Sequence, residues 1–76
     1  MATRRVKLSF PGDLIKEPVV YQLGRKFNIV TNIRRADYGW VVLEIQGDED
    51  EMQKALDWAA EIGVLVGPIE GDLIAG

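Results

Sequence analysis

The chain has 76 residues, a formal net charge of −3, and neither cysteine nor histidine. A domain of this size buries only about 60–65 % of its unfolded surface, so its stability margin is small and pairing with a second copy would add to it. Without cysteine the chain forms no disulfide, thiolate nucleophile or iron–sulfur ligation, and without histidine it lacks the commonest metal ligand and general base. We expect one domain over 1–76, with a core at 4–70 and a tail at 71–76, that has no cofactor or metal and is not an enzyme.

The charge is distributed unevenly along the chain. Residues 1–35 hold eight Lys/Arg and two acids, whereas residues 36–76 hold one lysine and ten acids. Two interpretations stay open: basic loops followed by a solvated acidic helix, or a dipolar surface suited to pairing. A net negative chain is not expected to bind nucleic acid generally. No apolar run approaches the roughly 20 residues of a membrane span and no signal-peptide segment opens the chain, so a cytoplasmic protein is expected.

The first two predicted elements are a strand over 4–10 and a helix over 17–26. In the strand, apolar and polar residues alternate, as in a half-buried strand. Its apolar positions are Val6, Leu8 and Phe10. A turn is predicted at Pro11-Gly12-Asp13. The helix has apolar positions at helical spacing, with Pro18 suited to its first turn. These positions are Val19 or Val20, Leu23 and Phe27.

A hairpin follows, with strands predicted over 28–36 and 40–46. In the first of these strands, Ile29 and Ile33 are expected to face the core, which leaves Val30 and Asn32 on the opposite face. The core-facing positions of the second strand are Val41, Leu43 and Ile45. Only Asp37-Tyr38-Gly39 joins the two strands, and its glycine can adopt the positive φ that a short hairpin requires.

The last predicted elements are a helix over 49–61 and an edge strand that starts at 64–66. Asp48 is expected to cap the helix, and Glu51 three residues later completes an aspartate variant of the capping box. The apolar stripe of the helix is Met52, Ala55, Leu56, Ala59 and Ile62. Gly63 ends the helix. Gly67-Pro68 interrupts the following strand, which suits an edge position.

The order β-α-β-β-α-β predicts an α+β ferredoxin-like sandwich, in which two helices cover one face of a four-stranded antiparallel sheet. The other face of the sheet is then bare. On that face, Trp40 with Val30 and Val42 is more apolar than solvation requires. Trp40 and Val42 are therefore the candidate interface residues.

The same bare face offers groups that fit an amino acid. The carboxamide of Asn32 both donates and accepts hydrogen bonds, and Arg34 can meet a carboxylate. Val30, Val42 or Trp40 can meet an apolar side chain. Because the pattern shows no deep pocket in one chain, a site between two subunits is expected. The alternative for Asn32 is a solvated strand residue without a ligand.

Several short segments together match one family. They are Phe27-Asn28, Asn32-Ile33-Arg34, the strand from Trp40 to Gly47, Ala55-Leu56-Asp57-Trp58 and Gly63-Val64. In these segments the chain resembles the NIL domain, a small ferredoxin-like module named for an Asn-Ile-Leu motif in its second strand. The similarity covers residues 4–70. Arg34 replaces the motif leucine, and the loop at 37–39 is shorter than is usual in the family.

The resemblance implies a role in sulfur-amino-acid biology. NIL domains of methionine-importer ATPases pair as dimers and bind methionine near the pairing interface, which restrains transport. The motif asparagine of that group, a ligand-contacting position, corresponds to Asn32. Other members accompany ferredoxin-type proteins or stand alone, and this chain resembles the stand-alone kind.

These observations predict a homodimeric, non-enzymatic regulatory domain that binds methionine or another sulfur amino acid. The predicted ligand-binding residues are Asn32, Arg34 and Val30, and the predicted interface residues are Trp40 and Val42. Two alternatives stay open. One is a module that docks a ferredoxin-type, enzyme or transporter-related partner, and the other is an engineered or trimmed ferredoxin-like scaffold without retained activity.

Overall fold

The computed structural model describes residues 2–68, in which strands and helices follow the predicted order. The strands are β1 (Ala2–Ser9), β2 (Ile29–Asp37), β3 (Trp40–Gly47) and β4 (Leu65–Gly67). The helices are η1 (Gly12–Lys16), α1 (Val19–Lys26) and α2 (Glu49–Glu61). The 3₁₀ helix η1 occupies the stretch where a turn alone was predicted. The predicted tail, 71–76, lies outside the described residues.

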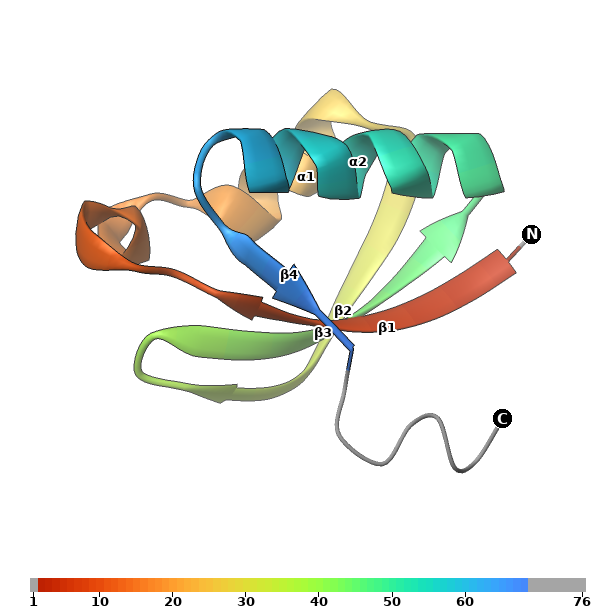
Figure 1. Ribbon diagram of the computed structural model, residues 1–76. Coiled ribbons are helices and arrows are strands. Elements are labelled where there is room, and N and C mark those ends of the chain that lie inside the picture. The colour runs from red at the N-terminus through yellow and green to blue at the C-terminus, as the bar shows by residue number, and fades with distance from the viewer. Residues whose placement is uncertain (1, 69–76) are drawn as a thin grey trace.

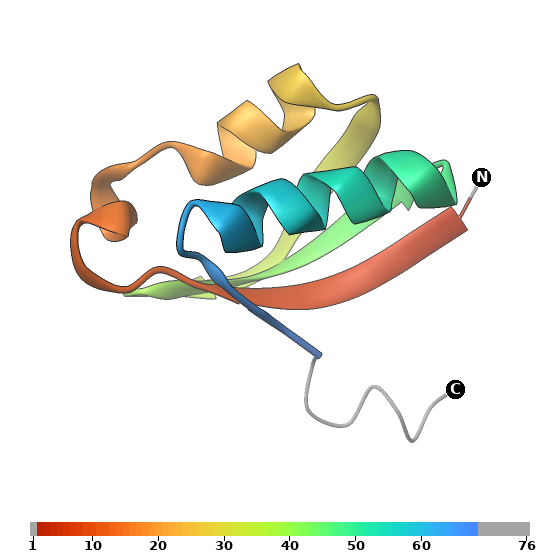
Figure 2. The ribbon, with the colours of Figure 1, turned by 45° about the horizontal axis from the view of Figure 1, so that its top comes forward.

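The four strands form one antiparallel sheet in the order β2-β3-β1-β4. Both α-helices lie over the same face of this sheet, and no described element covers the other face (Figures 1 and 2). This arrangement confirms the ferredoxin-like α+β fold. It also places β4 at one edge, as predicted, and β2 at the other.

The core lies between the helices and the sheet. Its side chains come from alternate strand positions and from the inward stripes of the two helices, because these are the positions that share a face. The largest fully buried side chains are Leu8, Val19, Leu23, Leu43, Ile45 and Met52. The alternation predicted for β3 is confirmed, since Val41, Leu43 and Ile45 are all buried.

The core prediction for Ile33 was wrong. This side chain is 59 % exposed, although Ile29 on the same strand is buried. Ile33 pairs with Leu43 and so lies on the helix side of the sheet. However, β2 is an edge strand of the sheet, and the helices do not cover this part of it. Alternation fixes the side of the sheet on which a residue lies, but not whether another element covers it.

The β2–β3 turn is one residue tighter than predicted. Asp37 pairs directly with Trp40, so only Tyr38 and Gly39 connect the strands. Gly39 has φ +90°, as a two-residue turn requires of a glycine. The backbone N–H of Phe10 donates to the carbonyl oxygen of Gly39 at 2.8 Å, which fixes the turn to the end of β1.

The capping box predicted for α2 does not form. Asp48 is the N-cap residue, but its side chain accepts no capping hydrogen bond. Instead, Glu51 Oε1 accepts a hydrogen bond from the backbone N–H of Asn28 at 2.9 Å. The first turn of α2 is therefore tied to the residue that precedes β2.

This contact predicts a pH-dependent contribution to stability. The backbone hydrogen bond from Asn28 lowers the pKa of Glu51 below its ordinary value of 4.5, with help from Lys54. A carboxyl group whose folded-state pKa is lowered stabilises the fold above its unfolded pKa and loses that contribution as the pH falls through the folded pKa. We therefore expect Glu51→Gln to be less stable than the parent at neutral pH, with a difference that shrinks below pH 4.5. Urea unfolding across this range measures it.

Glu61→Gln is the control, because it removes one carboxylate from the other end of the same helix. A stability difference for Glu51→Gln that stays constant as the pH falls would show that the carboxylate charge does not matter to the contact with Asn28.

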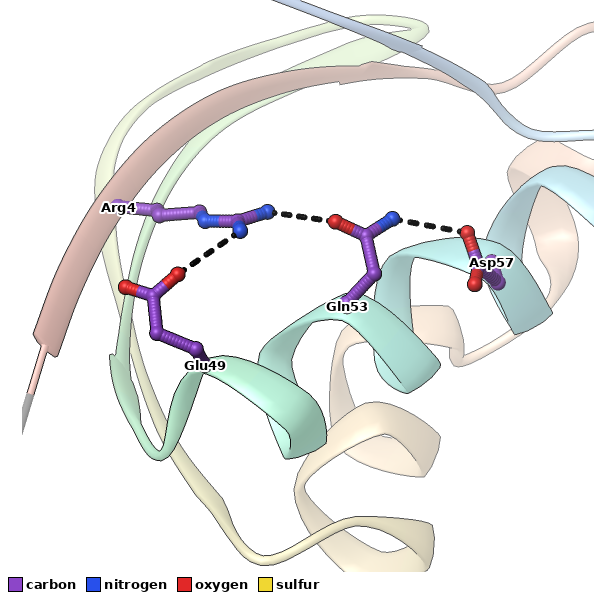
Figure 3. A network of polar contacts seen from close by, with 4 residues as sticks. All are labelled: Arg4, Glu49, Gln53 and Asp57. Atoms are coloured by element: carbon purple, nitrogen blue, oxygen red, sulfur yellow. Dashed lines mark hydrogen bonds and ion pairs between the residues drawn. The ribbon is translucent and has the colours of Figure 1, made fainter.

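A polar network joins β1 to α2 at the margin of the core (Figure 3). Arg4 donates to Glu49 Oε2 at 3.1 Å and to Gln53 Oε1 at 3.0 Å. Gln53 in turn donates to Asp57 Oδ1 at 2.9 Å. Because these groups are exposed to water, each such pair contributes about 0–1 kcal/mol to the free energy of unfolding. The network orients α2 on the sheet, while the buried side chains supply most of the stability.

Candidate functional site

Strand β2 is the most exposed element of the sheet. Every residue from Asn32 to Asp37 is exposed. In residues 2–68, no strand pairs with its outer side, so backbone N–H and C=O groups face solvent along that edge. An exposed edge of this kind can pair with another chain or bind a ligand through its backbone.

Asn32 lies on the open face of the sheet, within a polar row. It is opposite Glu44, which is opposite Arg5 on β1. Arg5 Nε donates to Glu44 Oε2 at 3.2 Å. In the described part of the chain, the Asn32 carboxamide has no such hydrogen bond, so its donor and acceptor groups are available.

Val30 lies on the same face as this row, whereas Arg34 is placed by a β-bulge and not by the regular register of β2. Val30 lies opposite Gln46 on the open face and is 53 % exposed. Arg34 is the extra residue of a β-bulge between Ile33 and Arg35, and it has no direct cross-strand partner. Arg35 takes the position opposite Val42 instead. Sequence alternation alone could not reveal this, because the bulge shifts the register by one residue.

A cavity of about 300 Å³ lies beside β2 on the helix side of the sheet. The end of β1, the start of α1 and the β2–β3 hairpin form its walls. Its lining residues are Phe10, Ile15, Glu17, Pro18, Val19, Val20, Tyr21, Ile33, Ala36, Asp37, Gly39, Trp40 and Val41. The only charged side chains among them are carboxylates, from Glu17 and Asp37. The residue pattern did not predict this cavity, because Ile33 occupies a position expected to face the closed core.

With this geometry established, the comparisons with known proteins identify the family. A family profile described as "NIL domain" matches residues 4–67. The chain belongs to the NIL domain family. A methionine import ATP-binding protein of Listeria monocytogenes (strain F2365) is 32 % identical over 73 residues, covering 86 % of this chain and 22 % of the relative. One from Vibrio vulnificus (strain YJ016) is 32 % identical over 69 residues, covering 80 % and 20 %.

The chain thus spans about a fifth of the length of these relatives. Its motif position, Asn32-Ile33-Arg34, lies on the exposed edge strand. Two side chains of the motif therefore lie on opposite faces of the sheet: Asn32 on the open face, and Ile33 at the cavity on the helix side.

The open face also holds the two predicted interface residues. Trp40 pairs with Ser9 and Val42 pairs with Lys7, and both apolar side chains are half-buried. Lys7 Nζ lies 4.7 Å from the centroid of the Trp40 ring, and Arg35 Cζ lies 5.9 Å from it. The structure therefore confirms that Trp40 and Val42 share this face, and it adds two cations that the sequence analysis did not assign to Trp40.

Residues 2–68 contain no group of three or more His, Cys, Asp or Glu placed to hold a metal ion. In the same range, no helix has the length and apolar character needed to cross a membrane.

Proposed function

We propose that this NIL domain is a non-enzymatic regulatory domain that binds methionine or a closely related sulfur amino acid at the edge of β2. Its membership of the NIL family and its similarity to proteins named as methionine import ATP-binding proteins support this role. The observation that carries the proposal is the exposed β2 edge. It presents the carboxamide of Asn32 on one face and an apolar cavity on the other.

The chemistry of the edge fits a free amino acid. Its carboxylate needs N–H donors, which the Asn32 carboxamide and the free backbone of an edge strand provide. Glu17 and Asp37 at the cavity attract the ammonium group. The unbranched thioether side chain is flexible and apolar, so it suits a small cavity lined by Phe10 and Ile33.

A second copy would complete this site. The cavity is open to solvent along β2, and binding sites for small molecules normally bury most of their ligand. Two copies that pair along β2 would cover Val30 and Ile33, which are 53 % and 59 % exposed in one chain. We infer a homodimer on the cytoplasmic side of the membrane, associated with methionine uptake or with another step of sulfur-amino-acid metabolism.

Isothermal titration of methionine into the purified chain, with the mass in solution recorded by light scattering, tests this function. We expect saturable binding by a dimer, with loss of binding in Ile33→Asp because the carboxylate enters the apolar side of the site. Leu65→Asp is the matched control, since Leu65 is 63 % exposed and lies on the opposite edge strand.

Absence of binding at millimolar methionine would contradict the proposal. If no ligand binds and the parent is unusually stable, the chain behaves as a ferredoxin-like scaffold without retained activity. Equal binding by Ile33→Asp and the parent would exclude the cavity as part of the site.

A further inference from the structure

The open face of the sheet holds a charged and aromatic patch whose cations the methionine proposal does not use. Lys7 and Arg35 both lie within 6 Å of the Trp40 ring centroid. In residues 2–68 neither cation forms an ion pair. Contact with an aromatic face leaves the N–H donors of both cations able to bind an anionic group. We call Lys7, Arg35, Trp40 and Val42 the cationic patch.

Two acids on this face accept hydrogen bonds from groups other than Lys7 and Arg35. Glu44 accepts a hydrogen bond from Arg5 at 3.2 Å. Asp37 Oδ1 accepts one from the backbone N–H of Tyr38 at 2.7 Å. Within residues 2–68, neither Lys7 nor Arg35 forms an ion pair with Glu44 or Asp37, so the N–H donors of both cations remain able to bind a negative surface.

The patch continues into a depression with both polar and apolar walls. Ser9 pairs with Trp40 on one side and with Leu65 on the other, so the three side chains form a row on the open face. The small serine lies between two large apolar residues, and Leu65 is 63 % exposed. A cavity of about 160 Å³ lies here, lined by Lys7, Ser9, Leu65, Val66, Gly67 and Pro68. One apolar side chain of a partner can enter over Ser9.

We propose that the cationic patch docks an acidic surface of another protein. Carboxylates of the partner bind Lys7 and Arg35, and an apolar side chain between them packs over Ser9 against Trp40 and Leu65. Tryptophan and arginine are the residue types that contribute most often to protein interfaces. Trp40 also lines the cavity at the β2 edge, but Lys7 and Arg35 do not, so variants of these two cations test the surface separately from the cavity.

Two other occupants fit less well. The acidic helix α2 of a second copy has the right charge, but sheet face against helix is a head-to-tail contact that leaves a free surface at each end and forms no closed dimer. Nucleic acid is disfavoured because the chain carries a net charge of −3, and neutralising phosphates requires a predominantly basic surface.

The test uses the full chain, labelled with ¹⁵N, and a short synthetic peptide that places a Leu-Phe pair between aspartates and glutamates. We expect the peptide to shift the indole N–H signal of Trp40 and the backbone signals of β1 and β3, while the signal of Trp58 on α2 stays in place. We expect Lys7→Gln with Arg35→Gln to weaken binding roughly tenfold or more. Added salt weakens the interaction in the parent.

The matched control is Arg25→Gln with Lys26→Gln. Arg25 Cζ lies 5.7 Å from the centroid of the Tyr21 ring, and Lys26 Nζ lies 5.4 Å from the centroid of the Trp58 ring. This variant therefore loses the same amount of charge and the same kind of cation–aromatic contact at another place on the surface. We expect it to bind the peptide like the parent. Equal weakening by both double variants, no shift at Trp40, or equal binding of a lysine version of the peptide would overturn the proposal. So would a response at Trp40 to oligothymidylate but not to the acidic peptide.

Discussion

Leu43→Ala is expected to destabilise the domain by about 2–5 kcal/mol, the cost of removing a fully buried leucine and leaving a cavity. Leu43 has no exposed surface and lies on β3, which pairs with both β1 and β2. A chain of this length has a total stability of roughly 4–11 kcal/mol. The variant therefore loses a large part of that stability. Urea unfolding followed by far-ultraviolet circular dichroism should show a lower midpoint with an unchanged slope.

The neighbouring substitution Val42→Ala is the control, because Val42 points to the open face and is only half-buried. We expect it to cost about 1 kcal/mol or less, as is usual on a solvated sheet face. If Val42→Ala lowers the free energy of unfolding as much as Leu43→Ala does, the open face is covered in solution. The cationic patch would then not be an exposed surface with free cations.

The sequence was sufficient to predict the element order and most of the core. Alternation over 40–46 correctly placed Val41, Leu43 and Ile45 inside. The helical stripe predicted α2 with the bounds that the structure shows, Glu49–Glu61. These patterns succeed because they depend only on the geometry of one element and on the need to bury one of its faces.

The candidate site was less predictable because it depends on how elements meet. Ile33 follows the core pattern but lies at the margin, where the helices do not cover β2. The bulge after Ile33 gives Arg35, rather than Arg34, the position opposite Val42. The residue pattern does not indicate how far the helices extend over the sheet. It also does not indicate a bulge that contains no glycine.

The cap of α2 illustrates the same limit. Asp48 and Glu51 have the spacing of a capping box, but the backbone N–H of Asn28 offers Glu51 another partner. Asn28 precedes Glu51 by 23 positions, so a local motif cannot reveal the competition. Spacing predicted which carboxylate belongs to the first turn, whereas the tertiary fold decided what that carboxylate binds.

Saturating methionine is expected to raise the free energy of unfolding of the parent, and Asn32→Ala is expected to abolish that rise. A ligand that binds only the folded state stabilises it by about 2.7 kcal/mol at a hundred times its Kd. Because the Asn32 side chain is exposed and has no hydrogen bond in the described residues, its removal should leave the stability of the unliganded fold almost unchanged. The variant thus separates ligand binding from folding. Urea unfolding with and without methionine measures both quantities.

Asn28→Ala is the matched control, because it removes the same carboxamide from the residue just before β2 and keeps the backbone N–H that Glu51 binds. We expect this variant to retain the full stabilisation by methionine. If methionine stabilises Asn32→Ala as much as the parent, the motif asparagine does not contact the ligand, and binding must depend on the backbone edge and the cavity alone. If methionine stabilises neither the parent nor Asn32→Ala, the exposed β2 edge serves only for pairing with a protein. The function is then better explained by docking of the acidic partner proposed for the open face.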